Sequence, residues 1–92
     1  MTDKVRCSHI LCQKQSRCLE ALERINKGES FNKVAMEMSE CPSRKRGGDL
    51  GFFGRRQMVR EFEDASFKLN IGEMTKEPVR TQFGYHIILR TA

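Results

Sequence analysis

Apolar and polar side chains alternate at the start of the chain. The segment from Val5 to Cys12 reads VRCSHILC, and every second residue in it shares one face. That face carries Val5, Cys7, His9 and Leu11. A period of two residues is typical of a β-strand, so this segment is predicted to be one.

Two helices are predicted after this strand. Over residues 15–27 apolar residues recur at helical spacing, at Cys18, Ala21, Leu22 and Ile25. Gly28 is well placed to end that helix, and Ser30 can cap the next one. The inner face of the second helix is predicted to carry Phe31, Val34, Ala35 and Met38. Pro42 disfavours helical geometry at Cys41, so this helix must end before it.

The second half of the chain predicts one more helix and three strands. A short strand is expected over Leu50–Phe53, a helix over about residues 60–67, and a final strand over Tyr85–Arg90. Pro78–Val79 can only start a strand or lie at a sheet edge, because proline donates no ladder hydrogen bond. The order β-α-α-β-α-β-β predicts one α+β domain over residues 1–92, in which helices cover a small, mainly antiparallel four-stranded sheet.

Composition bounds the class of protein. With 92 residues, 38% hydrophobic and 32% charged, the chain is expected to be soluble and globular. It has no apolar run long enough for a membrane span, and MTDKVRCSHIL lacks a signal-peptide core, so a cytoplasmic location is expected. The four cysteines are then expected to be free thiols, with two or three of them in the core. No metal is expected, because Cys7, His9 and Cys12 match no common zinc-ligand spacing.

The net charge of +5 raises the question of a nucleic-acid partner. Much of the positive charge is local, in the runs Arg44-Lys45-Arg46, Arg55-Arg56 and Arg60. A solvated loop explains such runs, and +5 is modest for a dedicated DNA-binding protein. Weak, salt-sensitive association with acidic partners is compatible with the sequence, whereas sequence-specific readout is not supported.

The candidate chemistry consists of a thiol, two histidines, a threonine and an apolar cup. The motifs CSHIL, CPS, GGDLGFF, QM, FEDASF and TQFGYHIILR occur in this order between Val5 and Arg90. Together they resemble the signature of the parvulin family of peptidyl-prolyl cis/trans isomerases, and in particular its single-domain members. The GxxGxxG spacing of Gly48, Gly51 and Gly54 lacks the GK[ST] of a phosphate-binding loop.

The resemblance implies the parvulin (FKBP-like) fold and a role for each motif. His9 and His86 would be paired on adjacent central strands, with Thr81 in their hydrogen-bond network, and Cys41 would face the reacting amide. The proline ring would bind between Leu50, Met58 and Phe62, with Phe53 as a further wall. The implied partners are proline-containing polypeptides, the implied state is a monomer, and no cofactor is implied.

Two positions depart from the family pattern. Phosphate-directed parvulins carry a basic loop after the first strand, but here Gln13 stands near the expected lysine and the arginine pair is missing. Strict dependence on phosphoserine or phosphothreonine before proline is therefore not expected. Phe83 replaces the small residue common before the Gly-x-His turn, and the sequence does not decide whether it narrows the site or only packs.

Alternative interpretations remain for the same residues. Without the resemblance, Leu50, Met58 and Phe62 would be read as core residues, and His9 as a buried histidine that holds the sheet. Cys41 has two possible roles, a nucleophile or a polar neighbour that tunes the local field, and the second is favoured because rotation needs no covalent adduct. The alternative function is a binding module that recognises proline-containing peptides without catalysis.

Overall fold

The computed structural model describes residues 3–92 and contains seven helices and strands in the predicted order, with one additional 3-10 helix. The elements are β1 (Lys4–Cys12), α1 (Gln15–Asn26), α2 (Phe31–Met38), the 3-10 helix η1 (Pro42–Arg46), β2 (Asp49–Gly54), α3 (Arg60–Lys68), β3 (Val79–Thr81) and β4 (Gly84–Arg90). The predicted order β-α-α-β-α-β-β is confirmed. The basic segment that was expected to be a loop forms η1 instead. Met1 and Thr2 of the predicted domain lie outside the described residues.

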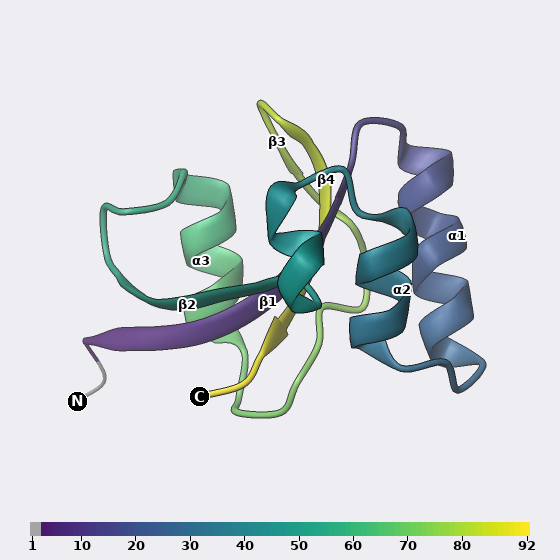
Figure 1. The fold of residues 1–92 in the computed structure, drawn as a ribbon. Coiled ribbons are helices and arrows are strands. Elements are labelled where there is room, and N and C mark those ends of the chain that lie inside the picture. The colour runs from purple at the N-terminus through teal and green to yellow at the C-terminus, as the bar shows by residue number, and fades with distance from the viewer. Residues whose placement is uncertain (1–2) are drawn as a thin grey trace.

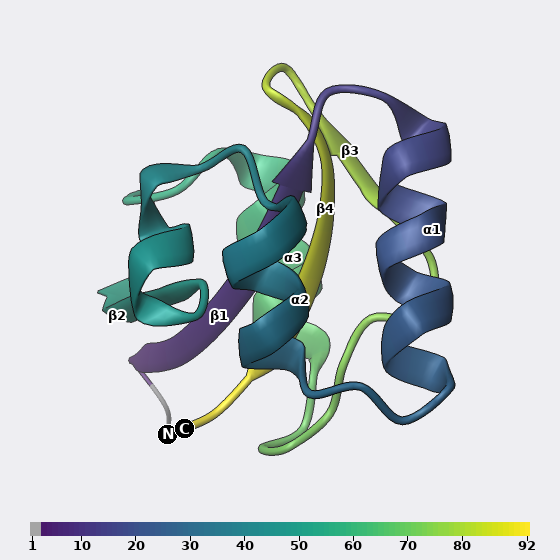
Figure 2. The same ribbon diagram turned by 45° about the vertical axis from the view of Figure 1, so that its right-hand side comes forward.

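The four strands form one antiparallel sheet in the order β2-β1-β4-β3. Helices α1 and α2 lie on one face and α3 lies on the other, as Figures 1 and 2 show. Because helices pack on both faces of the sheet, both faces of β1 are covered. The alternation in the sequence marked a single face, yet Ile10 and Cys12 on the opposite face are also fully buried.

The sheet separates two apolar clusters. The cluster under α1 and α2 is built from Ile10, Cys12, Cys18, Ala21, Leu22, Phe31, Val34, Ala35, Met38 and Ile87. The cluster under α3 is built from Val5, Cys7, Phe53, Phe62, Leu69 and Ile88. All four residues predicted for the inner face of the second helix are therefore in the core. The candidate site lies beside the second cluster, near the carboxyl end of β1.

Local signals in the sequence explain where α1 and α2 end. Gly28 follows α1 with a φ of +110°, which strains residues with a side chain. The Ser30 hydroxyl accepts a hydrogen bond from the backbone N–H of Lys33 at 3.1 Å and caps α2. After Met38 the chain becomes extended, as the Cys41-Pro42 pair requires.

All four cysteines are free thiols, as expected, and Cys7, Cys12 and Cys18 are buried. None of the helices formed by residues 3–92 is both long enough and apolar enough to span a bilayer.

Candidate functional site

Two buried histidines face one another at the centre of the sheet. In the antiparallel register of β1 and β4, His86 lies opposite Leu11, and His9 lies opposite Ile88. Both imidazoles point to the α3 side, where their Nδ1 atoms are 3.0 Å apart. His9 is 5% exposed and His86 is 4% exposed, so the contact is screened from water. The predicted pairing of the two histidines on adjacent central strands is thus present in the structure.

Thr81 extends this contact into a chain of hydrogen bonds. Its Oγ1 lies 2.7 Å from Nε2 of His86 and accepts a hydrogen bond from the backbone N–H of Phe83 at 3.1 Å. Fewest groups are left without a partner if the Thr81 hydroxyl donates to Nε2 of His86 and Nδ1–H of His86 donates to His9. The proton of neutral His9 then lies on its Nε2, which is buried and has no hydrogen-bond partner among the described residues.

Burial sets the charge of the histidine pair. Burial, together with a smaller effect of the neighbouring His86, lowers the pKa of His9 to about 4. Burial likewise lowers the pKa of His86 to about 4. A charged imidazole loses its hydration when it is buried, and no carboxylate among residues 3–92 bonds to either ring to compensate. Both histidines are therefore neutral at pH 7 and act as hydrogen-bonding groups.

The Phe62 ring closes one side of the histidine pair. It approaches both imidazoles edge-on, with centroid distances of 5.4 Å to His9 and 5.2 Å to His86. The two imidazoles are themselves nearly parallel, 5.2 Å apart. Phe62 is only 3% exposed, so it excludes water from the rings while its apolar surface contributes to the cavity wall.

Ser39 positions Cys41 beside the histidines. The Ser39 hydroxyl accepts hydrogen bonds from the backbone N–H of Leu11 at 3.1 Å and of Cys41 at 3.3 Å. The carbonyl of Leu11 in turn accepts from Glu40 N–H at 2.7 Å, so the segment after α2 is tied to the end of β1. Pro42 keeps Cys41 extended. Ser39 is a positioning residue that sequence reasoning missed.

Gly48 holds the backbone of His9 in place. Its carbonyl accepts the His9 N–H at 2.9 Å, and its φ is +89°. A Cβ at this position would lie 2.4 Å from the His9 carbonyl oxygen. The paired glycines of the sequence are therefore needed here so that η1 and β2 can approach β1 closely.

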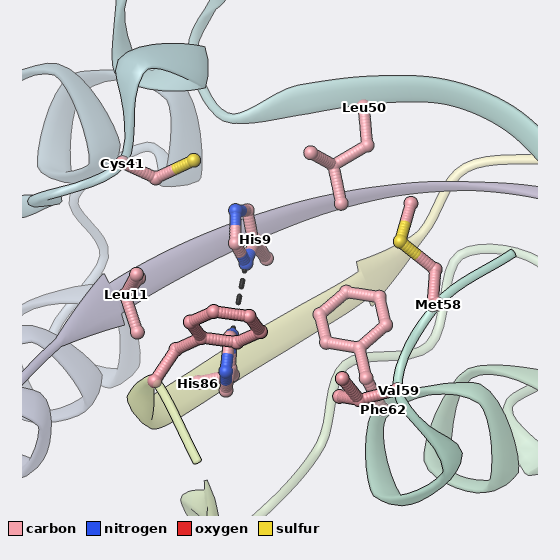
Figure 3. A pocket seen from close by; sticks show the side chains of 9 residues that line it. His9, Leu11, Cys41, Leu50, Met58, Val59, Phe62 and His86 are labelled. Carbon is pink, nitrogen blue, oxygen red and sulfur yellow. Dashed lines mark hydrogen bonds between the residues drawn. The ribbon is translucent and has the colours of Figure 1, made fainter. Parts of the chain in front are cut away.

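These elements enclose one apolar cavity of about 290 Å³ (Figure 3). Its walls come from β1, β2, β4, α3 and the loops between them. The lining residues are His9, Leu11, Cys41, Leu50, Met58, Val59, Phe62, Phe83 and His86. His9 lies between Cys41 and His86, and the side chains of Leu50, Met58 and Phe62 gather on one side of it. The polar atoms of the site thus lie at the border of the apolar cavity.

The structure brings most of the predicted site residues together. Leu50, Met58 and Phe62 line the cavity with both histidines and Cys41, while Thr81 contacts it only through His86. Their roles in catalysis remain predictions.

Phe53 is the exception, because it does not line the cavity in this structure, and its predicted role as a wall for the substrate stays a prediction. It is 2% exposed and packs behind Phe62, with ring centroids 5.9 Å apart. Leu50 and Phe53 are three residues apart, so strict alternation would put them on opposite faces of β2. The irregular pairing of β1 with β2 at Gly51, whose φ is +74°, instead lets both pack on the α3 side, where Phe53 is the more deeply buried of the two.

Two lining residues were not predicted as part of the site. Leu11 lies two residues after His9, so the strand alternation could have identified it. Val59 precedes α3 beside Met58 and has no distinct sequence signal. Phe83, left undecided from the sequence, does line the cavity and is 54% exposed.

The charged residues lie outside this cavity. Arg44 and Lys45 line a neighbouring polar hollow together with Ser39, Glu40, Cys41 and Pro42. Arg55 pairs with Glu63 at 3.2 Å, and Arg60 pairs with Asp64 at 3.8 Å. Among residues 3–92 no group of three histidine, cysteine or acidic side chains is placed to hold a metal ion.

Comparison with known proteins gives consistent results. Residues 9–92 match the family model described as "Rotamase: PPIC-type PPIASE domain". The foldase protein PrsA of Geobacillus kaustophilus is 49% identical over 86 residues, which is 92% of this chain and 30% of the relative. The PrsA foldase of Bacillus subtilis is 45% identical over 89 residues and is also covered to 30%. The chain therefore spans about a third of the length of these curated relatives.

Solved structures extend the similarity to smaller proteins. The crystal structure of PrsA from Bacillus subtilis superposes with a TM-score of 0.93 at 44% identity, covering 98% of this chain and 35% of that one. The solution structure of NmPin, the parvuline of Nitrosopumilus maritimus, superposes with a TM-score of 0.85 at 47% identity. There the alignment covers 100% of this chain and 99% of the other, so the similarity extends over nearly the whole of both molecules.

Proposed function

This chain belongs to the parvulin family of peptidyl-prolyl cis/trans isomerases, and we propose that it accelerates rotation about X-Pro bonds in unfolded or flexible polypeptide segments. Such an activity would assist folding or conformational switching of its clients. The observation that carries the proposal is the apolar cavity with Cys41 and the neutral histidine pair at its border.

The apolar walls favour rotation by their effect on the amide. The planar X-Pro amide is stabilised by resonance that separates charge, and rotation must overcome a barrier of about 18–20 kcal/mol. Water solvates the separated charges, so a water-poor pocket around the prolyl nitrogen disfavours the planar form relative to the twisted one. Leu50, Met58, Val59 and Phe62 supply such surroundings. Preferential binding of the twisted amide is then the source of the rate increase.

The polar groups serve to orient the amide. Rotation breaks no covalent bond, so neither a nucleophile nor a net proton transfer is needed. In the proton arrangement above, Nε2–H of His9 is a buried donor without a protein partner, on the side of the ring away from His86 (Figure 3). The thiol of Cys41 lies on this side as well. Cys41 is only partly buried and is placed to contact the carbonyl of the residue before proline as it turns.

Phosphate independence is supported by the charges around the cavity. None of the nine lining residues is lysine, arginine or acidic. At the end of β1, where phosphate-directed parvulins carry basic residues, Gln13 N–H donates to the carboxylate of Glu40 at 3.1 Å. A carboxylate at this place repels a phosphate dianion, and the basic pair Arg44 and Lys45 shares its hollow with the same Glu40.

We also propose an oligomeric state and a cellular compartment for the domain. The large exposed apolar side chains are spread over several elements, at Leu19, Met36, Phe52, Ile71 and Phe83, which supports a monomer. Four free thiols support action in a reducing compartment, as the cytoplasm is. Sedimentation of the purified domain tests the first point, and a thiol count on protein isolated from its own cells tests the second.

The deciding experiment is NMR exchange spectroscopy on short X-Pro peptides with and without the protein. The residue before proline is varied through Leu, Ala, Lys, Glu and phosphoserine. Accelerated exchange that is strongest for the neutral residues is expected. Acceleration confined to phosphoserine or Glu would contradict phosphate independence, and chemical-shift changes without acceleration on any peptide would show a binding module instead of an enzyme.

A further inference from the structure

Phe83 is a large apolar residue that lines the cavity from the turn between β3 and β4. More than half of its surface, 54%, remains exposed to solvent. The other aromatic residue of the cavity wall, Phe62, is 3% exposed and serves the core as well. Phe83 is absent from both apolar clusters of the core. Its exposed ring is thus available to a ligand in the cavity.

The turn that carries Phe83 is fixed in place. The Phe83 N–H donates to Thr81 Oγ1, which is itself hydrogen-bonded to His86. The next residue, Gly84, has a φ of +137°, and a Cβ there would lie 2.7 Å from the Cys12 carbonyl oxygen. The backbone of the turn is thus held against the end of β1. A ligand that binds this side chain therefore does not have to order the backbone of the turn, and only side-chain rotamer freedom is lost.

The apolar lining has two ends with polar groups between them. Leu50, Met58, Val59 and Phe62 form one end, and Leu11 lies at the other, beyond His9 (Figure 3). Phe83 belongs to the end of Leu11, because the next residue, Gly84, packs against the backbone of Cys12 and Gln13, directly after Leu11. Cys41 and the histidines occupy the border between these ends.

The cavity is larger than a proline ring requires. A ring of five non-hydrogen atoms takes up on the order of 150 Å³ at the ~30 Å³ that one water molecule occupies in the liquid. The cavity measures about 290 Å³. If the proline ring binds at the end formed by Leu50, Met58, Val59 and Phe62, the X-Pro amide lies beside Cys41 and the histidines, because the amide is the polar group of the substrate segment. The chain before proline then runs toward Leu11 and Phe83.

We propose that Phe83 determines specificity by binding the side chain of the residue immediately before proline, and that it favours large apolar side chains there. This inference rests on the proposed isomerase function and assigns the site its substrate class. Leu11 and Phe83 offer only apolar surface, so a carboxylate at that position loses hydration without gaining a partner. A small side chain such as alanine leaves the Phe83 ring uncovered.

The test compares three variants on four peptides by NMR exchange. The peptides carry Leu, Phe, Ala or Glu before proline, and the variants are Phe83→Ser, Phe83→Leu and the control Phe52→Ser. Phe52 matches Phe83 in residue type and exposure, at 60%, but lies on β2 outside the cavity. Amide spectra of each variant establish that the fold is intact.

The expected result is a loss of kcat/KM that is confined to peptides with a large apolar residue before proline. Phe83→Ser should lower kcat/KM for the Leu-Pro and Phe-Pro peptides about tenfold, the factor expected when roughly 50–60 Å² of apolar surface is no longer covered. The Ala-Pro and Glu-Pro values should stay within about twofold, Phe83→Leu should restore most of the Leu-Pro rate, and Phe52→Ser should change no peptide.

Two outcomes would overturn this inference. If Phe83→Ser lowers kcat/KM equally for all four peptides, Phe83 acts on the site through Thr81 and does not bind the substrate side chain. If the variant has the same profile as Phe52→Ser, the ring does not contact substrate. Absence of catalysis by the unmodified protein on every peptide would instead refute the isomerase function, and the inference with it, so the two failures are distinguishable.

Discussion

His9 and His86 share a buried hydrogen bond between their Nδ1 atoms, at 3.0 Å, and this bond exists only while the rings are not both charged. Burial supports the same state, because the pKa of each histidine is lowered to about 4. The two neutral histidines therefore form a hydrogen bond that connects the two central strands, β1 and β4. The geometry and the protonation of the pair are linked.

This linkage predicts that the protein loses stability in mild acid. Each folded-state pKa lies below the unfolded value of 6.5, so the unfolded chain binds more protons in the interval between them. The contribution of the pair is fully present above pH 6.5 and is lost as pH falls toward 4. The loss is up to about 3 kcal/mol for each histidine. Urea unfolding at pH 7.5, 6, 5 and 4.5, with NMR titration of the imidazoles, measures it.

The ion pair of Arg6 with Asp49 supplies a control for that experiment. It lowers the pKa of Asp49 below its usual 3.8, so its contribution is lost only at more acidic pH than that of the histidines. Asp49→Asn should therefore leave the decline between pH 6.5 and 4 unchanged. A free energy of unfolding that is flat from pH 7.5 to 4.5 would contradict the neutral pair.

Cys41→Asp is expected to retain substantial isomerase activity, within about tenfold of the unmodified protein. A carboxylate keeps a polar group at the border of the cavity, whereas it cannot act as a thiol nucleophile in a covalent step. The kcat/KM for a Leu-Pro peptide measures the effect, with Cys18→Ala as the control for a thiol outside the site. Loss of activity in a folded Cys41→Asp protein would refute the electrostatic role.

Met58 and Phe53 should separate activity from stability. Met58→Ala removes a half-buried side chain from the cavity wall, so kcat/KM should fall by about tenfold or more. Phe53→Leu alters only the packing behind Phe62 and should lower the free energy of unfolding by about 1–2 kcal/mol. Its kcat/KM should stay within about twofold at temperatures where the variant is folded. If Phe53→Leu lowers kcat/KM as much as Met58→Ala does, Phe53 contributes to the cavity wall after all.

Gly48→Ala is expected to destabilise the protein by roughly 3 kcal/mol or more. The new Cβ would clash with the His9 carbonyl oxygen, so the backbone that carries the His9 imidazole must shift. Gly28→Ala is the matched control, since Gly28 also has a positive φ but an added Cβ meets nothing within 4 Å. Gly28→Ala should lower the free energy of unfolding by about 1–2 kcal/mol. Thermal unfolding of both variants gives the comparison, and equal effects would show that conformation alone matters at Gly48.

Local patterns in the sequence were sufficient for the order of helices and strands. Helix α2 begins after a serine cap and ends before a proline, and these signals act over a few residues. The pairing of His9 with His86 was predicted from the resemblance to the parvulin family, because strand alternation alone does not say which strands are neighbours. The motifs between Val5 and Arg90 were sufficient for the family, as the comparisons confirm.

Only the tertiary structure decided which apolar side chains line the cavity. Phe53 and Leu50 lie on one short strand, and the irregular pairing at Gly51 puts both on the α3 side, yet only Leu50 reaches the cavity because Phe53 is buried behind Phe62. Leu11, Val59 and Phe83 reach the cavity from three other parts of the chain. The protonation of the histidines likewise depends on burial by Phe62, which is distant from both in sequence. Caps, turns and periodicity depend on neighbouring residues and can be read from the chain, whereas a cavity is what remains between surfaces packed from distant segments.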